Sequence, residues 1–162
     1  MSPWFQIVLF LHVFGAILAF GPTYAYSVIG AMGGKEPMHA NFATRVTDAI
    51  GRQRVYPLAI LQGVTGVLLI WLGSIDLTKS LWLGIAIVLY AFALGYGLTI
   101  QRNAVHHLIE VTTMPAGGPP PGAPAGPPPG VREAVAKVQQ GGIILGITIA
   151  VIVFLMVTKL SF

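Results

Sequence analysis

The sequence lacks cysteine altogether, which excludes disulfides, thiolate metal sites and cysteine nucleophiles. Charge is also scarce, because only 9% of the 162 residues are charged, whereas a soluble domain has about 25%. This number of charged residues is too small to cover the surface of a soluble domain. The composition therefore excludes a typical cytosolic domain and a disordered chain. The net charge of +4 rests on only nine Lys and Arg. We therefore expect no nucleic-acid partner and assign these residues to membrane topology.

Hydrophobic residues are abundant and gather in four long runs. They make up 55% of the chain, and the mean hydropathy is +0.79. Each run is close to the ~20 residues that cross a hydrocarbon core of ~30 Å, where the backbone must be helical. The sequence predicts an all-α, four-helix transmembrane bundle in a single integral membrane domain, residues 1–162. Its spans lie at about 4–29, 55–73, 81–101 and 141–160.

A signal peptide is the alternative interpretation of the first hydrophobic run, because this run lies at the N-terminus. No Lys or Arg precedes Lys35, and the apolar run is longer than the hydrophobic part of a signal peptide. We expect a retained helix.

The basic residues predict the orientation. Only Lys79 and Lys159 lie on one side of the predicted spans, and the other seven lie in the two longer connections. The positive-inside rule places those connections in the cytoplasm and both termini on the outer side of the inner (plasma) membrane. Near the outer boundary lie three tryptophans, as in an interfacial aromatic belt: Trp4, Trp71 and Trp82.

The two longer connections differ in kind. Apolar and charged residues alternate at helical spacing over 41–54, which predicts an amphipathic helix on the inner surface before Pro57 begins the second crossing. Residues 114–130 are almost wholly Pro, Gly and Ala, which predicts a cytoplasmic linker without a core. We interpret it as a spacer, with a docking site for a partner as the alternative.

Small residues recur at spacings of three and four in every span, which favours close helix packing in a membrane. The same faces could seat a flat cofactor instead. The predicted inward faces are His12, Gly15, Ala16, Ala19, Thr23, Ser27 and Gly30; Ala59, Gln62, Gly63 and Gly66; Gly84, Ala91 and Gly95; and Gly142, Gly146 and Ala150.

His12 is the one histidine inside a predicted span, and an ionisable residue there is a functional candidate. Three interpretations stay open: a neutral structural histidine, an axial ligand of haem b, or part of a metal or proton path. Counting the same depth along the other spans reaches Thr65 and Tyr90, which we expect as hydrogen-bond partners. Because no second histidine lies at this depth, a bis-histidine haem within one chain is not expected.

The remaining polar residues give weaker signals. Gln62 is interpreted as a contact between helices, with ligand binding as the alternative. His106 and His107 lie close to Glu110 and could bind a divalent metal, but we favour the interpretation of a solvated helix end at the membrane surface. No metal site and no catalytic residue is predicted, and the absence of carboxylates from the predicted spans argues against a proton-coupled transporter.

Several short motifs resemble one family. Leu11-His12 and the Gly/Ala-rich run to Gly21 resemble the first helix of predicted four-helix integral membrane proteins of unknown function. That family is distantly similar to CopD-type copper-resistance proteins and HemJ-type protoporphyrinogen oxidases. Further matching motifs are Asp48-Ala49-Ile50-Gly51, Pro57, Thr65-Gly66 and Phe154-Leu155-Met156-Val157 with Lys159.

The resemblance implies haem at a first-helix histidine in the HemJ-type relatives, and His12 matches that position. Thr23 follows Pro22 where those oxidases have Arg, which argues against oxidase activity. We therefore expect a non-catalytic structural or accessory subunit of a larger membrane complex. It would contact lipid and pair with a partner membrane protein, or with itself, through its small-residue faces. The alternative is a haem b oxidoreductase with His12 as the axial ligand.

Overall fold

The computed structural model describes residues 2–113 and 130–159, and all the regular elements in these two ranges are helices. They form four long rods. Rod 1 contains α1 (Pro3–Phe20), η1 (Gly21–Tyr24) and α2 (Ala25–Lys35). Rod 2 follows the short turn η2 (Pro37–His39) and contains α3 (Ala40–Ile50), η3 (Gly51–Val55) and α4 (Tyr56–Leu72). Rod 3 contains α5 (Leu81–Tyr96), η4 (Gly97–Gln101) and α6 (Arg102–Thr112), and rod 4 is α7 (Val131–Thr158).

The rods have 33, 33, 32 and 28 residues, and each is long and apolar enough to cross a membrane. The predicted all-α fold with four spans is therefore confirmed. Of the predicted linker at 114–130, only Gly130 lies within the described residues. At 1.5 Å per residue, the longest rods measure about 50 Å, whereas the hydrocarbon core of a bilayer is about 30 Å thick. Part of each rod therefore extends beyond the hydrocarbon.

Three of the rods change their helix type near the middle. Pro22 lies in the 3-10 turn η1 of rod 1, and Gly51 and Gly97 begin the wider π turns η3 and η4. Rod 4 has no such turn, but its Gly141 lies at the same level, because the side-chain amide of Gln101 at the end of η4 packs against Gly141 and donates to the Val138 carbonyl on α7. We call this level, defined by η1, η3, η4 and Gly141, the waist of the bundle.

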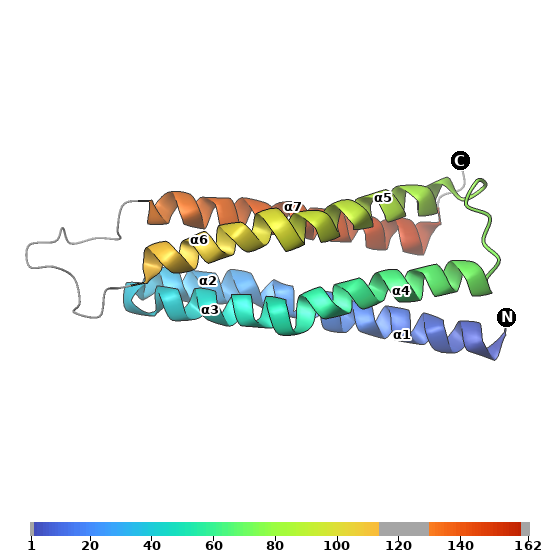
Figure 1. Ribbon diagram of the computed structural model, residues 1–162, viewed down its shortest axis with the longest axis horizontal. Helices are drawn as coiled ribbons and strands as arrows, with labels where there is room; N and C mark the ends of the chain where they lie inside the picture. The colour runs from blue at the N-terminus through green and yellow to red at the C-terminus, as the bar shows by residue number, and fades with distance from the viewer. Residues whose placement is uncertain (1, 114–129, 160–162) are drawn as a thin grey trace, which may run out of the picture.

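The rods pack as two antiparallel hairpins (Figure 1). In the first, α1 packs along α4 and α2 along α3; in the second, α7 packs along α5 and α6. The hairpins meet mainly through α3 and α6, on one side of the waist, while α4 and α5 touch little. Asn41 strengthens this junction, because its amide donates to the carbonyl of Ile109 at 3.0 Å. The bundle is thus closed at one end and more open at the other.

The predicted amphipathic helix exists, but it does not lie along a surface. The structure continues α3 through the π turn η3 into α4, so that both belong to one rod of 33 residues (Figure 1). α3 packs along α2 and α6, which half-bury Val46 and Ile50, while Phe42 stays exposed. Protein therefore takes the place that the sequence analysis gave to the membrane surface.

The two ends of the bundle differ in chemistry. Trp4, Trp71 and Trp82 all belong to the end where α1 and α5 begin and α4 ends, which we call the tryptophan end. Lys79 and Lys159 lie at this end too. We call the other half, from the waist to the opposite end, the basic end. It carries the other seven basic residues: Lys35, Arg45, Arg52, Arg54, Arg102, Arg132 and Lys137.

At the tryptophan end a short turn joins α4 to α5. The Asp76 carboxylate accepts hydrogen bonds from the Thr78 hydroxyl at 2.6 Å and the Thr78 backbone N–H at 2.9 Å. These two bonds favour the charged carboxylate and lower the pKa of Asp76. The turn is therefore held by a local side-chain contact and exposes its charge to water.

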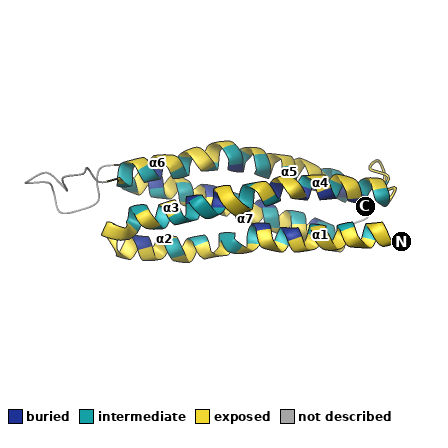
Figure 2. Ribbon diagram, turned by 60° about the horizontal axis from the view of Figure 1, so that its bottom comes forward, coloured by how far each residue is buried: buried dark blue, intermediate teal, exposed yellow. Residues whose placement is uncertain are grey.

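Buried positions form narrow bands along the rods, and large apolar side chains cover most of the rest (Figure 2). The predicted inward faces are confirmed where α1 meets α4: Gly15, Ala19, Ala59 and Gln62 are buried. On rod 1 the face fails beyond Ala19, since Ser27 and Gly30 are exposed. The overwound turn η1 changes the helical phase there.

The inward faces predicted for the second hairpin are wrong. Gly142, Gly146 and Ala150 are exposed, and so are Ala91 and Gly95, whereas Gly84 is half-buried. Rod 4 instead buries residues at intervals of seven, on a face that the predicted glycines do not share. These residues are Ala134, Gly141, Thr148 and Leu155.

Candidate functional site

His12 lies at the packed seam between α1 and α4. Its Nδ1 is 2.8 Å from the hydroxyl oxygen of Thr65, which confirms one of the two predicted partners. The predicted bond to Tyr90 is wrong, because the Tyr90 hydroxyl donates to the Ala59 carbonyl at 2.9 Å. Tyr90 thereby links α5 to α4, whereas His12 and Thr65 join two helices of the first hairpin.

The surroundings of the Thr65 hydroxyl let us infer which nitrogen of His12 carries the proton. It lies 3.0 Å from the Leu61 carbonyl and 3.1 Å from the Gln62 carbonyl, and both of these oxygens can only accept. The single hydroxyl hydrogen therefore points into its own helix, and the oxygen accepts from Nδ1–H of His12. This tautomer leaves Nε2 with a free lone pair, which can accept a proton or bind a metal.

The glycines around His12 are filled by protein side chains. A Cβ atom on Gly15 would lie 2.5 Å from the Gln62 amide nitrogen, and one on Gly63 would lie 2.5 Å from the Tyr90 hydroxyl. His12 itself occupies the face of Gly66, where a Cβ would be 3.6 Å from its Cε1. These faces therefore serve close packing, as one of the two interpretations predicts, and offer no open plane for a flat ring.

A haem at this position would find a suitable donor but no cradle. The unprotonated Nε2 of His12 has the chemistry of an axial ligand, with Thr65 as the supporting partner on the other nitrogen. The neighbouring glycines are already covered. The assignment of His12 to haem therefore stays a prediction.

A second polar cluster lies on the basic side of the waist. Asp48 on α3 is buried, with 8% of its surface exposed. Its carboxylate oxygens lie 2.9 Å from Nε of Arg52 and 3.7 Å from Nε2 of His106 on α6. The hydroxyl of Tyr26 is buried nearby, 3.9 Å from the Cβ position of Gly51. Asp48 therefore joins the two hairpins where they pack most closely.

Asp48 lies in one of the motifs that resemble the family, but the sequence predicts no role for it, because it lies outside the predicted span. Its signal was the spacing of four to Arg52 on an otherwise amphipathic helix. The structure also separates the two candidate metal ligands, since His106 faces Asp48 while His107 lies 3.9 Å from Glu110. Among the described residues, no three His, Asp or Glu side chains gather as a metal site would require.

Comparison with known proteins identifies the family. No curated protein and no solved structure matches the chain. The distant similarity to CopD-type and HemJ-type proteins therefore stays a prediction. The family model described as "Predicted integral membrane protein (DUF2269)" matches residues 6–160. This match includes rods 2 to 4, nearly all of rod 1 and both polar clusters, so the chain belongs to this family of predicted integral membrane proteins of unknown function.

Proposed function

We propose that this protein is a non-catalytic structural subunit that assembles with another membrane protein through the second hairpin. The observation that carries the proposal is a set of small residues that the chain does not use for its own packing. Gly142 and Gly146 are exposed on α7, and a Cβ atom on either would meet nothing within 4 Å in the described chain. Gly95 on α5 is exposed in the same way.

Small exposed residues matter in a membrane because lipid gives no hydrophobic drive for helix association. Close backbone approach, which glycine permits, is then a main source of contact energy. Gly142, Gly146 and Ala150 repeat at intervals of four, which places them along one side of α7. On the neighbouring helix α5, Ala91 and Gly95 are also exposed and four residues apart.

The test is the size of the assembly in native membranes. After mild solubilisation, the wild-type chain should migrate on a native gel as a complex larger than the monomer. Gly146→Leu should shift it to the monomer size, because the bulky side chain keeps a partner helix away. Ile147→Leu is the matched control, since Ile147 is also exposed but large. A wild-type chain that stays monomeric after cross-linking in intact membranes would contradict the proposal.

We propose further that the basic end faces the cytoplasm and the tryptophan end faces outward, with both termini outside. The distribution of the nine basic residues supports this orientation. Single cysteines placed at Thr78 and at Glu36 test it, because the natural chain has none. An impermeant thiol reagent should label the first in intact cells and the second only after the membrane is opened.

A second candidate function is haem b binding through Nε2 of His12. The tautomer fixed by Thr65 favours it, because it leaves this nitrogen free. Protein purified from haem-replete membranes should then show a Soret band that His12→Ala abolishes and Gln62→Leu retains. Absence of the band from the wild-type protein would remove this candidate.

A further inference from the structure

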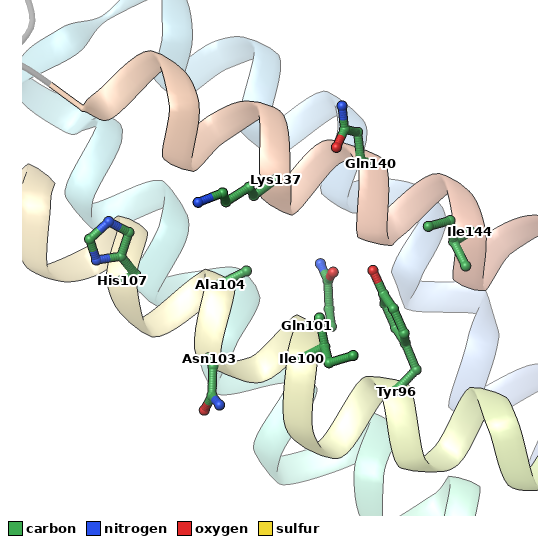
Figure 3. Close-up of a pocket in the computed structure, with 9 residues that line it drawn as sticks. All are labelled: Tyr96, Ile100, Gln101, Asn103, Ala104, His107, Lys137, Gln140 and Ile144. Atoms are coloured by element: carbon green, nitrogen blue, oxygen red, sulfur yellow. The ribbon is translucent and has the colours of Figure 1, made fainter.

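A cavity of about 570 Å³ opens between rod 3 and rod 4 at the waist (Figure 3). Toward one end of the cavity, Ile100 and Ile144 lie with the uncharged polar side chains of Gln101, Gln140 and Tyr96 (Figure 3). Lys137 and His107 lie toward the other end (Figure 3). The basic side chains of the lining are therefore gathered at one end.

The amide of Gln101 holds the cavity wall together. Its nitrogen donates to the Val138 carbonyl on α7 at 3.1 Å, and its oxygen lies against Gly141, where a Cβ would collide with it. That oxygen is buried and has no hydrogen-bond partner among the described residues. Gln101 thus fills the place where rods 3 and 4 approach closely at Gly141. The cavity extends from Gln101 toward Lys137.

The cavity lies at the level of lipid headgroups. Nineteen residues separate Trp82 at the tryptophan end from Gln101 in the cavity wall, which corresponds to about 28 Å of helix. This distance matches a hydrocarbon core of about 30 Å. If the tryptophans mark one interface, the end of the cavity with Lys137 and His107 meets the other.

We propose that this cavity binds one acidic phospholipid. Its phosphate would lie beside Lys137 and His107, and one acyl chain would run along Ile100 and Ile144. Charge favours an anionic headgroup, because seven basic but only four acidic residues lie on the basic half of the bundle. Basic pockets between membrane helices at the interface are suited to such headgroups.

The partners of Lys137 and His107 within the chain set the strength of the site. The Lys137 ammonium lies 2.9 Å from the Glu133 carboxylate, but both side chains are exposed, and such surface pairs contribute only about 0.2–1 kcal/mol. An ammonium has three donors, so the lipid phosphate can bind beside this carboxylate. His107 is likewise only loosely paired, 3.9 Å from Glu110. Glu133 therefore competes with the lipid for the same ammonium.

The experiment is native mass spectrometry of the full chain in detergent, titrated with phosphatidylglycerol or with phosphatidylcholine of identical acyl chains. The wild type should bind one phosphatidylglycerol more tightly than phosphatidylcholine. Lys137→Gln should weaken that binding about five-fold, the equivalent of about 1 kcal/mol per basic residue at an anionic surface. Glu133→Gln should strengthen it, because the competing carboxylate is gone.

Lys79→Gln is the matched control, since Lys79 is also exposed and paired with a carboxylate, at the opposite end. It should leave lipid binding unchanged. Ala104→Phe fills the cavity and should remove the bound lipid without changing any charge. The proposal is overturned if both lipids bind equally, or if Lys137→Gln and Lys79→Gln behave alike. It is also overturned if glycerol phosphate displaces the lipid at equal concentration, because the acyl chain would then contribute nothing.

Discussion

Replacing Thr65 by valine tests the seam that joins α1 to α4. Valine keeps the shape of threonine but removes the oxygen that accepts from Nδ1 of His12 at 2.8 Å. It also removes a hydroxyl that bonds the carbonyl four residues earlier. Thr148 on α7 is buried to a similar degree, and its hydroxyl bonds the Ile144 carbonyl at 2.8 Å. The substitution Thr148→Val therefore measures only the loss of a buried hydroxyl that bonds its own helix, an effect that Thr65→Val shares.

The difference between the two valine variants is the contribution of the bond between the helices. Hydrogen bonds between membrane helices average about 0.6 kcal/mol and reach about 1.7 kcal/mol. We therefore expect Thr65→Val to lower the free energy of unfolding by about 0.6–1.7 kcal/mol more than Thr148→Val does. This difference corresponds to about 3- to 20-fold in the unfolding equilibrium constant. The upper part of the range applies if Nδ1–H finds no other acceptor, because an unpaired buried donor is costly.

The assay is reversible unfolding of the purified chain in mixed micelles with increasing SDS, followed by circular dichroism. A double-mutant cycle with His12→Leu isolates the pairwise term. The coupling should equal the difference between the two valine variants. If Thr65→Val and Thr148→Val cost the same and the cycle shows no coupling, the bond between His12 and Thr65 contributes nothing and the reasoning is refuted.

Three further perturbations follow from the packing and the charges. Gly63→Ala should cost about 1–3 kcal/mol of stability in the same SDS assay, because the new Cβ displaces the Tyr90 ring that fills the site. Asp48→Asn should cost about 1–3 kcal/mol, since it removes the buried carboxylate between the hairpins. Thr78→Val should raise the pKa of Asp76, seen by NMR titration, because a hydrogen bond to the charged carboxylate is lost. The small stabilisation from that bond is present above the ordinary aspartate range and is lost as the pH falls through the lowered pKa.

The two stability predictions each have a matched control. Gly146→Ala adds the same methyl group where nothing lies within 4 Å of it, so it should not destabilise the isolated chain; equal losses for both glycines would contradict the packing argument. Glu36→Gln breaks an exposed pair with His39 and should change stability by less than about 0.5 kcal/mol. A loss as large as that of Asp48→Asn would show that burial of Asp48 is unimportant. If the pKa of Asp76 were unchanged in Thr78→Val, the Thr78 hydroxyl would not be the cause of its lowering.

The hydropathy of the sequence was enough to predict four helical spans, because a bilayer allows few other structures. The depth count from the predicted boundary likewise found Thr65 as the partner of His12. It misplaced Tyr90, since depth fixes the level of a side chain but not the direction in which it points. The Ala59 carbonyl, which Tyr90 binds, is a backbone group that no sequence pattern reveals.

The inward faces of the second hairpin could not be read from glycine and alanine alone. Small residues permit contact with any neighbour, whether in the same chain or outside it. The faces of rod 1 were predicted correctly up to Ala19 and incorrectly beyond it, because the prediction assumed one helical period throughout. Asp48 was overlooked for a related reason: the helix of the second span begins at Ala40, well before its apolar part.

The π turns at the waist bear on which single-residue deletions the chain tolerates. A π turn closes its hydrogen bonds over five residues instead of four, so it holds about one residue more than a regular turn. Losing one residue from Gly51–Val55 or Gly97–Gln101 would convert that turn to ordinary α-helix and leave both flanking segments facing as before. The same loss inside α4 or α5 would rotate everything beyond it by about 100°. Shorter members of the family should therefore have their gaps at these two five-residue segments.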